Sequence, residues 1–164
     1  LISLGTMANE NLDFYKNCFE ALGSREDIDI IMSIGKRINI NDLGVIPKNF
    51  KLYNYIPQLE VLKKVDLFIT HGGMNSTSEG LYYNIPLIIV PQFGDQATVA
   101  KRVSTLGAGI ALIGRDNYTA DSIKLAVDKI LFDNSYKENA FKIGKSLRDA
   151  GGYKKGAEII KSIL

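Results

Sequence analysis

Apolar residues gather in short runs along the chain, and the stretches between them have helical spacing. The runs cover residues 1–4, 28–34, 50–56, 65–70, 86–90 and 109–113. Between the first two, Leu12, Tyr15 and Phe19 repeat at intervals typical of one helix face. Strands that alternate with helices are joined by crossovers and therefore pair in parallel. Several runs are apolar throughout, as in strands covered on both sides. The pattern predicts an α/β, Rossmann-like parallel sheet of about six strands with helices on both faces.

The rest of the chain is predicted to be helical or irregular. Residues 119–133, 135–150 and 153–164 have helical spacing, whereas residues 36–49 contain asparagine, glycine and proline and are expected to loop over the surface. A length of 164 residues fits one domain with a substantial core. The chain opens on "LISLGT" without an initiator methionine. We therefore expect a single domain, 1–164, cut from a longer protein.

Composition narrows the class of protein. Apolar residues make up 46% and charged residues 23%, and the net charge is +2, without a run of like charge in either half. These values favour a globular protein and give no sign of a nucleic-acid partner. No apolar stretch reaches the roughly 18 residues that a membrane helix needs. Cys18 is the only cysteine, so no internal disulfide can form, and we expect a buried thiol in a protein of the cytoplasm.

Sheets of this kind bind ligands beyond the carboxyl ends of their strands, so the strand-to-helix turns are the places to search. The turn "HGGMNSTSE", residues 71–79, combines two glycines with asparagine and hydroxyl donors at the start of a helix. Glycines let a ligand approach the backbone, and a helix N-terminus favours an anion. The turn therefore suits a diphosphate. Ser76 and Glu79 could instead form a capping box, and this alternative stays open.

Other turns offer polar groups on the same edge. Asp95 and Gln96 in "PQFGDQ" could exchange hydrogen bonds with sugar hydroxyls, although Asp95 could simply cap a helix. In "SLGT", the Thr6 hydroxyl is another donor within reach of a diphosphate, and Asn9 is a possible helix cap. Tyr55 and Gln58 put an aromatic face beside an amide, which suits a nucleobase. Together the turns indicate a nucleotide-sugar groove.

Three features of the sequence could indicate a catalytic, metal or cofactor site. His71 has no Ser or Asp partner that the sequence places beside it, and a helix N-terminus disfavours an imidazolium, so we interpret it as a neutral donor to phosphate. "DID", residues 27–29, resembles a metal-binding acidic pair but precedes a strand instead of following one. "GAGIAL", residues 107–112, lacks the third glycine of a dinucleotide fingerprint. We expect no metal and no cofactor.

Residues 55–96, "YIPQLEVLKKVDLFITHGGMNSTSEGLYYNIPLIIVPQFGDQ", resemble the donor-binding signature of family 1 glycosyltransferases, most closely the bacterial macrolide-type (MGT) UDP-glycosyltransferases. The opening "SLGT" and the closing "LRDAGGYKKGAEIIKSIL" also resemble the two ends of that family's C-terminal half. The resemblance implies a GT-B fold of two Rossmann-like halves, of which this chain is the second. It also implies inverting, metal-independent transfer of a hexose from a UDP-sugar to a hydroxyl of a small acceptor.

The resemblance assigns roles to individual residues. The residues implied for the diphosphate are Thr6, His71, Gly73, Asn75, Ser76 and Thr77. Glu79 would bind the ribose, Asp95 and Gln96 the sugar, and Tyr55 and Gln58 the nucleobase, where Tyr55 replaces the family's usual tryptophan. The catalytic base, a histidine, would lie in the N-terminal acceptor-binding half, so this chain alone would catalyse little. Alternatives are another GT-B enzyme, such as a lipid or cell-wall sugar transferase or a nucleotide-sugar epimerase, and a non-catalytic nucleotide-binding module.

Overall fold

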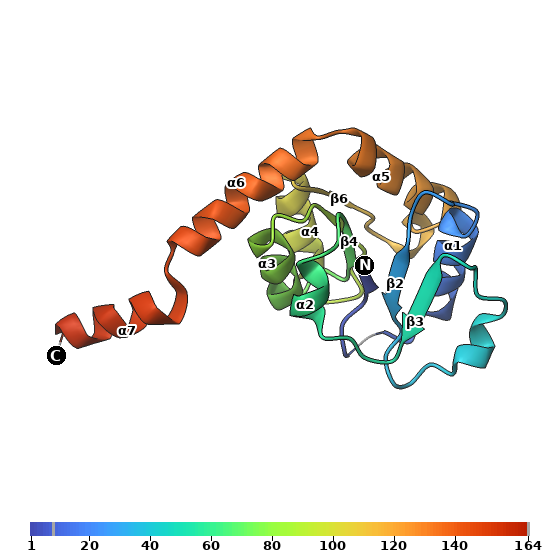
Figure 1. Ribbon diagram of the computed structural model, residues 1–164, viewed down its shortest axis with the longest axis horizontal. Coiled ribbons are helices and arrows are strands. Elements are labelled where there is room, and N and C mark those ends of the chain that lie inside the picture. Colours follow the sequence, from blue (N-terminus) through green and yellow to red (C-terminus); the bar gives the residue numbers. More distant parts are fainter. Residues whose placement is uncertain (8, 164) are drawn as a thin grey trace.

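A computed structural model describes residues 1–7 and 9–163 and contains one parallel sheet. Its strands lie in the order β3-β2-β1-β4-β5-β6 (Figure 1). Their bounds are β1 Ile2–Ser3, β2 Ile30–Ser33, β3 Phe50–Tyr53, β4 Phe68–Thr70, β5 Leu87–Ile89 and β6 Gly109–Ala111. Every neighbouring pair is parallel. The predicted six-stranded Rossmann-like sheet is confirmed, and the order reverses direction beside β1, where such folds place their ligands.

Helices cover both faces of the sheet. Their bounds are α1 Leu12–Leu22, α2 Gln58–Leu62, α3 Met74–Tyr82, α4 Gln96–Thr105, α5 Ala120–Phe132, α6 Ser135–Asp149 and α7 Gly152–Ile163. Helices α1 and α5 pack on one face, and α2, α3 and α4 on the other. Successive residues of β5 alternate between the two cores, with Leu87 in one and Ile88 in the other. This explains why the strand is apolar at every position.

Local capping sets where two helices begin. Asn11, and not Asn9 as predicted, caps α1, because its side-chain oxygen accepts from the Phe14 backbone N–H at 3.1 Å. Thr119 caps α5 by accepting from the Ser122 N–H at 3.2 Å. Asn9 instead lies 4% exposed among the loops at the carboxyl edge of the sheet. Asn9 therefore takes no part in the start of α1.

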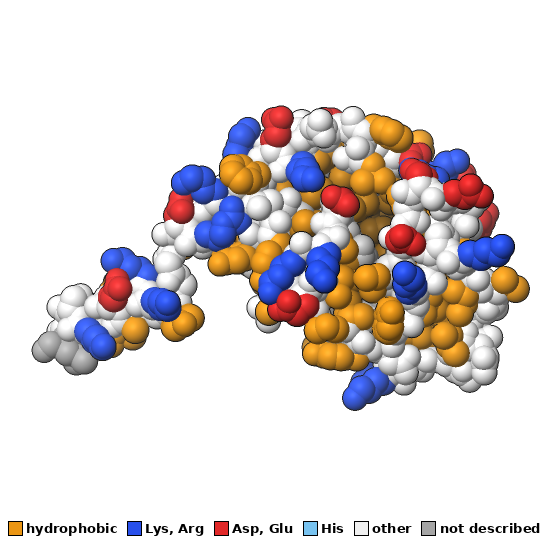
Figure 2. Space-filling model, viewed as in Figure 1, with side chains coloured by type: hydrophobic (Ala, Val, Ile, Leu, Met, Phe, Trp, Pro, Cys, Tyr) orange, Lys and Arg blue, Asp and Glu red, His pale blue; other side chains and the backbone are white. Residues whose placement is uncertain are grey.

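Two segments depart from a simple layered body. Residues 36–49 contain no strand or α-helix, as predicted, but they do not run wholly over the surface, since Ile38 and Leu43 are buried and a 3-10 helix spans Ile40–Leu43. Helix α7 stands apart from the body (Figures 1 and 2). None of its described residues is buried, and Tyr153 and Ile163 are 84% and 79% exposed. Helix α7 therefore contributes to neither core.

Two further expectations from the sequence concerned the cysteine and membrane-spanning helices. Cys18 is free and buried in α1, as predicted, and burial raises the pKa of its thiol well above the ordinary range. Throughout residues 1–7 and 9–163, no helix combines the length and the apolar character that crossing a bilayer requires.

Candidate functional site

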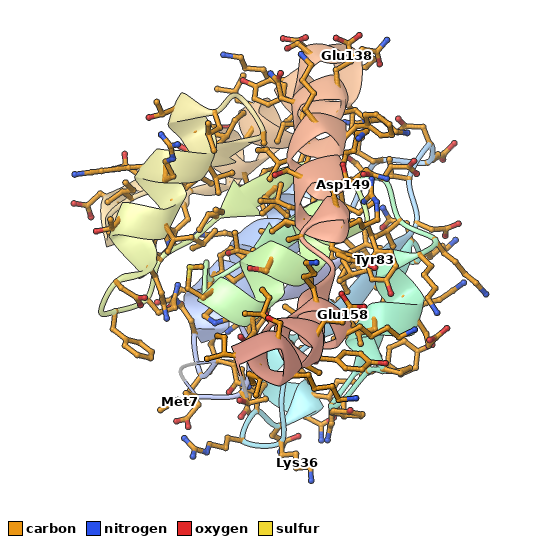
Figure 3. All side chains as sticks on the ribbon, turned by 90° about the vertical axis from the view of Figure 1, so that its left-hand side faces the viewer. Met7, Lys36, Tyr83, Glu138, Asp149 and Glu158 are labelled. Atoms are coloured by element: carbon orange, nitrogen blue, oxygen red, sulfur yellow. The ribbon has the colours of Figure 1, made fainter. Side chains whose placement is uncertain are left out.

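An open cleft of about 1190 Å³ lies at the carboxyl edge of the sheet. Because parallel strands end at the same edge, the loops after β1, β2, β3, β4 and β5 all contribute to it. Met7, from the loop after β1, and Lys36, from the loop after β2, both lie at this end of the molecule in Figure 3. Predicted site residues on the cleft are Thr6, Tyr55, Gln58, His71, Gly73, Asn75, Ser76, Glu79 and Gln96. Nine predicted residues from separate turns therefore share one surface.

Helix α3 presents free backbone N–H groups to this cleft. Gly73 occupies its N-cap position, and the first intrahelical bond runs from the Thr77 N–H to the Gly73 carbonyl at 2.9 Å. The N–H groups of residues 74–76 precede that bond, and no side chain among the described residues caps the helix. Ser76 lies inside the first turn, so the capping-box alternative is wrong. An uncapped helix N-terminus of this kind favours an anion.

His71 is held between two glycines. A Cβ atom on Gly5 would lie 2.7 Å from His71 Cε1, and one on Gly73 would lie 2.4 Å from His71 Nε2. The Thr70 hydroxyl is 3.4 Å from Nδ1. Partial burial lowers the pKa of His71, so its imidazole is neutral at neutral pH. A Thr70 hydroxyl that donates to Nδ1 leaves the proton on Nε2, beside the start of α3.

Gln58 connects three predicted subsites. Its Nε2 donates to Glu79 Oε2 at 2.7 Å and to Ser76 Oγ at 3.3 Å. Residues predicted for the nucleobase, the ribose and the diphosphate are thereby in direct contact. Tyr55, on the same wall of the cleft, is 73% exposed and presents its ring to solvent. An exposed aromatic ring that shares a cleft with an amide and a carboxylate suits a nucleoside.

The loop after β5 is arranged differently. Gln96 is 3% exposed, and its side-chain oxygen accepts from the backbone N–H groups of Gln92 at 2.8 Å and Phe93 at 3.2 Å. Asp95 occupies the N-cap position of α4, but its side chain makes no capping hydrogen bond. It is exposed and lies outside the residues that line the cleft. Gln96 thus supports its own loop, and Asp95 points its carboxylate to solvent beside it.

Thr77 is not on the cleft surface. Its side chain is 4% exposed, and its hydroxyl oxygen is buried without a protein hydrogen-bond partner in the described residues. Its backbone N–H is already bonded to Gly73. The structure therefore gives Thr77 neither a free backbone donor nor a cleft-facing hydroxyl for a diphosphate, because the fourth position of α3 turns toward the core.

Sequence reasoning missed several cleft residues. Asn9, Ser33, Gly35, Lys36, Arg37, Met74 and Phe93 line the cleft. Ser33 ends β2 and residues 34–37 directly follow it, so their place at the end of a predicted strand was a signal that could have identified them. Arg37 pairs with Glu10 at 2.8 Å across the loops after β2 and β1. Both side chains are largely exposed, so the ion pair contributes little stability.

Asp27 and Asp29 lie away from the cleft. They precede β2 and therefore lie at the opposite edge of the sheet. Asp27 pairs with Arg25 at 2.6 Å, and this guanidinium lowers the pKa of the carboxyl group. In the described part of the chain, no three His, Cys, Asp or Glu side chains gather as a metal site would require. The carboxylate of Asp27 is therefore paired with Arg25 and not part of a metal site among the described residues.

Fold and cleft together define a Rossmann-like α/β domain that offers a helix N-terminus to an anion. Comparison with known proteins agrees. The sequence pattern of the family described as erythromycin biosynthesis protein CIII-like, C-terminal domain, matches residues 18–163. The uncharacterized UDP-glucosyltransferase YojK of Bacillus subtilis (strain 168) is 44% identical over 161 residues, covering 97% of this chain and 39% of that protein.

Two further comparisons point the same way. The NDP-glycosyltransferase YjiC of Bacillus subtilis (strain 168) is 40% identical over 164 residues, covering 100% of this chain and 41% of that protein. The crystal structure of the glycotransferase of kitacinnamycin superposes with a TM-score of 0.91 at 33% identity, covering 99% of this chain and 42% of that one. The chain thus spans about two fifths of the length of these proteins.

The chain belongs to the family of erythromycin biosynthesis protein CIII-like C-terminal domains. The resemblance to macrolide-type glycosyltransferases and to the second half of a GT-B fold is confirmed. The match includes the cleft residues from β2 to α4, whereas those of the loop after β1 precede the matched range.

Proposed function

We propose that this chain is the donor-binding domain of a glycosyltransferase that moves a hexose from a UDP-sugar to a hydroxyl of a small acceptor. The observation that carries the proposal is the cleft at the start of α3, where free N–H groups and the neutral His71 face one surface with the Gln58–Glu79 pair. A diphosphate needs donors, and a ribose needs a carboxylate that accepts from its hydroxyls.

The proposed placement follows from the order of groups along the cleft. The diphosphate lies against residues 73–76, with Thr6 and His71 beside it, and the ribose lies against Glu79. The uracil stacks on Tyr55, whose exposed ring lines the same cleft. The sugar extends toward the loop that holds Asp95 and Gln96, which lies after the next strand of the sheet.

The proposed chemistry divides between this chain and the rest of the protein. The acceptor oxygen forms a bond to the anomeric carbon while the bond from that carbon to the diphosphate breaks, and the configuration inverts. The acceptor proton goes to a histidine base in an acceptor-binding half outside this chain. Residues 71–76 stabilise the negative charge that develops on the leaving UDP. No metal or cofactor is assigned a role, and we place the reaction in the cytoplasm, where the lone buried Cys18 stays reduced.

Calorimetric titration with UDP, UDP-glucose, dTDP and NAD tests the proposal. We expect UDP and UDP-glucose to bind, UDP more tightly than dTDP, and NAD not at all. A chain that bound NAD but not UDP would contradict the proposal. If dTDP bound more tightly than UDP, uridine would have to be replaced by thymidine as the donor nucleoside.

A further inference from the structure

Side chains and glycines alternate across three loops at the diphosphate end of the cleft. In order they are Gly35 after β2, Asn9 and Gly5 after β1, and His71 and Gly73 after β4. A Cβ on Gly35 would lie 2.2 Å from Asn9 Nδ2, a Cβ on Gly5 2.7 Å from His71 Cε1, and a Cβ on Gly73 2.4 Å from His71 Nε2. We call this arrangement the glycine stack. Each side chain fills space that its neighbouring glycines leave open.

The glycine stack contains two side chains, His71 next to the start of α3 and Asn9 farther from it. Asn9 is the buried one. It is 4% exposed, and its Nδ2 donates to the Gly5 carbonyl at 2.8 Å. Gly5 has a φ of +79°, a conformation that most side chains avoid, and its α-carbon faces the His71 ring. The amide of Asn9 therefore holds the peptide against which the imidazole rests.

We infer that Asn9 is a positioning residue that fixes His71 through Gly5. The loop after β1 contains Thr6 and Met7, both exposed, and its Gly5 approaches the His71 ring closely. Without the bond from Asn9, the Gly5 peptide loses its side-chain anchor, and the imidazole loses one of its two walls. The inference rests on the proposed function, in which His71 donates to the diphosphate. It requires no contact between Asn9 and the ligand.

The first test replaces Asn9. Asn9→Asp keeps the size of the side chain, but a carboxylate cannot donate to the Gly5 carbonyl; Asn9→Ala removes the group altogether. We expect both to raise the Kd for UDP by about tenfold, the effect of one lost buried hydrogen bond. His71 is the only histidine, so its Cε1 proton gives a single imidazole signal in the NMR spectrum. That signal should move in both variants even without UDP.

Asn49→Ala is the matched control. Asn49 is half-buried, and its Nδ2 likewise donates to backbone carbonyls, those of Leu22 and Arg25, both at 2.9 Å. It precedes β3 and therefore lies at the opposite edge of the sheet. We expect this substitution to lower the melting temperature without changing the Kd for UDP or the imidazole signal.

A pair of glycine substitutions tests the same inference from the other side. Gly35→Ala places a methyl group against Asn9, whereas Gly44→Ala meets no atom within 4 Å. Both glycines have a positive φ, +77° and +78°, so both substitutions strain the backbone. We expect both variants to lose stability, and only Gly35→Ala to move the imidazole signal and weaken UDP binding.

The outcomes distinguish a failure of the inference about Asn9 from a failure of the proposed function. If the imidazole signals of Asn9→Asp and Gly35→Ala coincide with that of the unaltered chain, the inference is wrong. It is also wrong if these signals move while the Kd for UDP stays the same. If the unaltered chain fails to bind UDP, the proposed function is wrong, and the NMR comparison of the free proteins still decides whether Asn9 positions His71.

Discussion

Two neighbouring strand-to-helix turns use their polar groups in opposite ways. After β4, Gly73 starts α3 without a side-chain cap, and the N–H groups of residues 74–76 face the cleft. After β5, Gln96 reaches back and accepts from the N–H groups of Gln92 and Phe93. The first turn leaves its N–H groups without a side-chain partner, whereas the second bonds its N–H groups to an internal amide.

The difference predicts that the two turns contact different parts of a nucleotide sugar. Free N–H groups at a helix start attract negative charge, so such a turn suits a diphosphate. In the turn after β5, the Gln96 side chain occupies the N–H groups of Gln92 and Phe93, and Asp95 lies exposed at the N-cap of α4. Asn11 also contacts this turn, because its Nδ2 donates to Gln92 Oε1 at 3.3 Å. We therefore expect substitutions in the first turn to affect every nucleotide ligand, and those in the second to affect only the sugar.

The largest expected effect comes from Gly73→Ala. The added Cβ would lie 2.4 Å from His71 Nε2, so the imidazole or the helix start must move. Losing aligned donors to a charged diphosphate should weaken UDP binding by about a hundredfold in calorimetry. The control is Gly156→Ala on exposed helix α7, where a Cβ meets nothing within 4 Å. Equal UDP affinity in the two variants would show that this turn does not hold the diphosphate.

Glu79→Ala should have the next largest effect. Removing the carboxylate takes away both the acceptor for ribose hydroxyls and the partner of Gln58, so the Kd for UDP should rise about thirtyfold. Because Glu79 is not part of a capping box, the melting temperature should fall little. Glu138→Ala is the control, since this exposed carboxylate lies in the first turn of α6, far from the cleft edge (Figure 3). A purely thermal defect in Glu79→Ala would contradict a ribose contact.

Asp95→Asn sharpens the comparison between the turns. The substitution keeps the side chain's size but removes its charge, and the hydrogen bonds to Gln96 should stay intact. We expect UDP-glucose to bind about tenfold more weakly, whereas UDP binds as before. The ratio of the two Kd values measured by calorimetry is the relevant quantity. Equal losses for both ligands would exclude a contact between Asp95 and the sugar.

The smallest expected effect is on the pH dependence of stability. Burial lowers the pKa of His71 in the folded chain below its ordinary value of 6.5. Below that pH the unfolded chain binds more protons than the folded chain, so the free energy of unfolding should fall as the pH falls. Denaturant titrations of the unaltered chain and of His71→Gln measure this difference. Identical pH slopes in the two proteins would show that His71 does not titrate differently on folding.

Much of the fold was determined by the sequence alone. Runs that are apolar at every position, such as residues 86–90, predict strands covered on both faces, and β5 does alternate between two cores. The glycines and hydroxyls of residues 71–79 predicted a helix start at the ligand edge, which α3 provides. These inferences succeed because periodicity and backbone freedom are local properties, set within a few residues.

Only the tertiary structure decided which side chains meet. Gln58 and Glu79 form a hydrogen bond because α2 packs against α3, and nothing in the spacing of the two residues indicates it. Thr77 and Asp95 looked equivalent to their neighbours in sequence, yet one turns into the core and the other lies outside the cleft. Asparagine is a residue type favoured at helix N-caps, but Asn9 lies between two glycines. Such contacts depend on how several elements pack together, and a linear pattern does not contain that information.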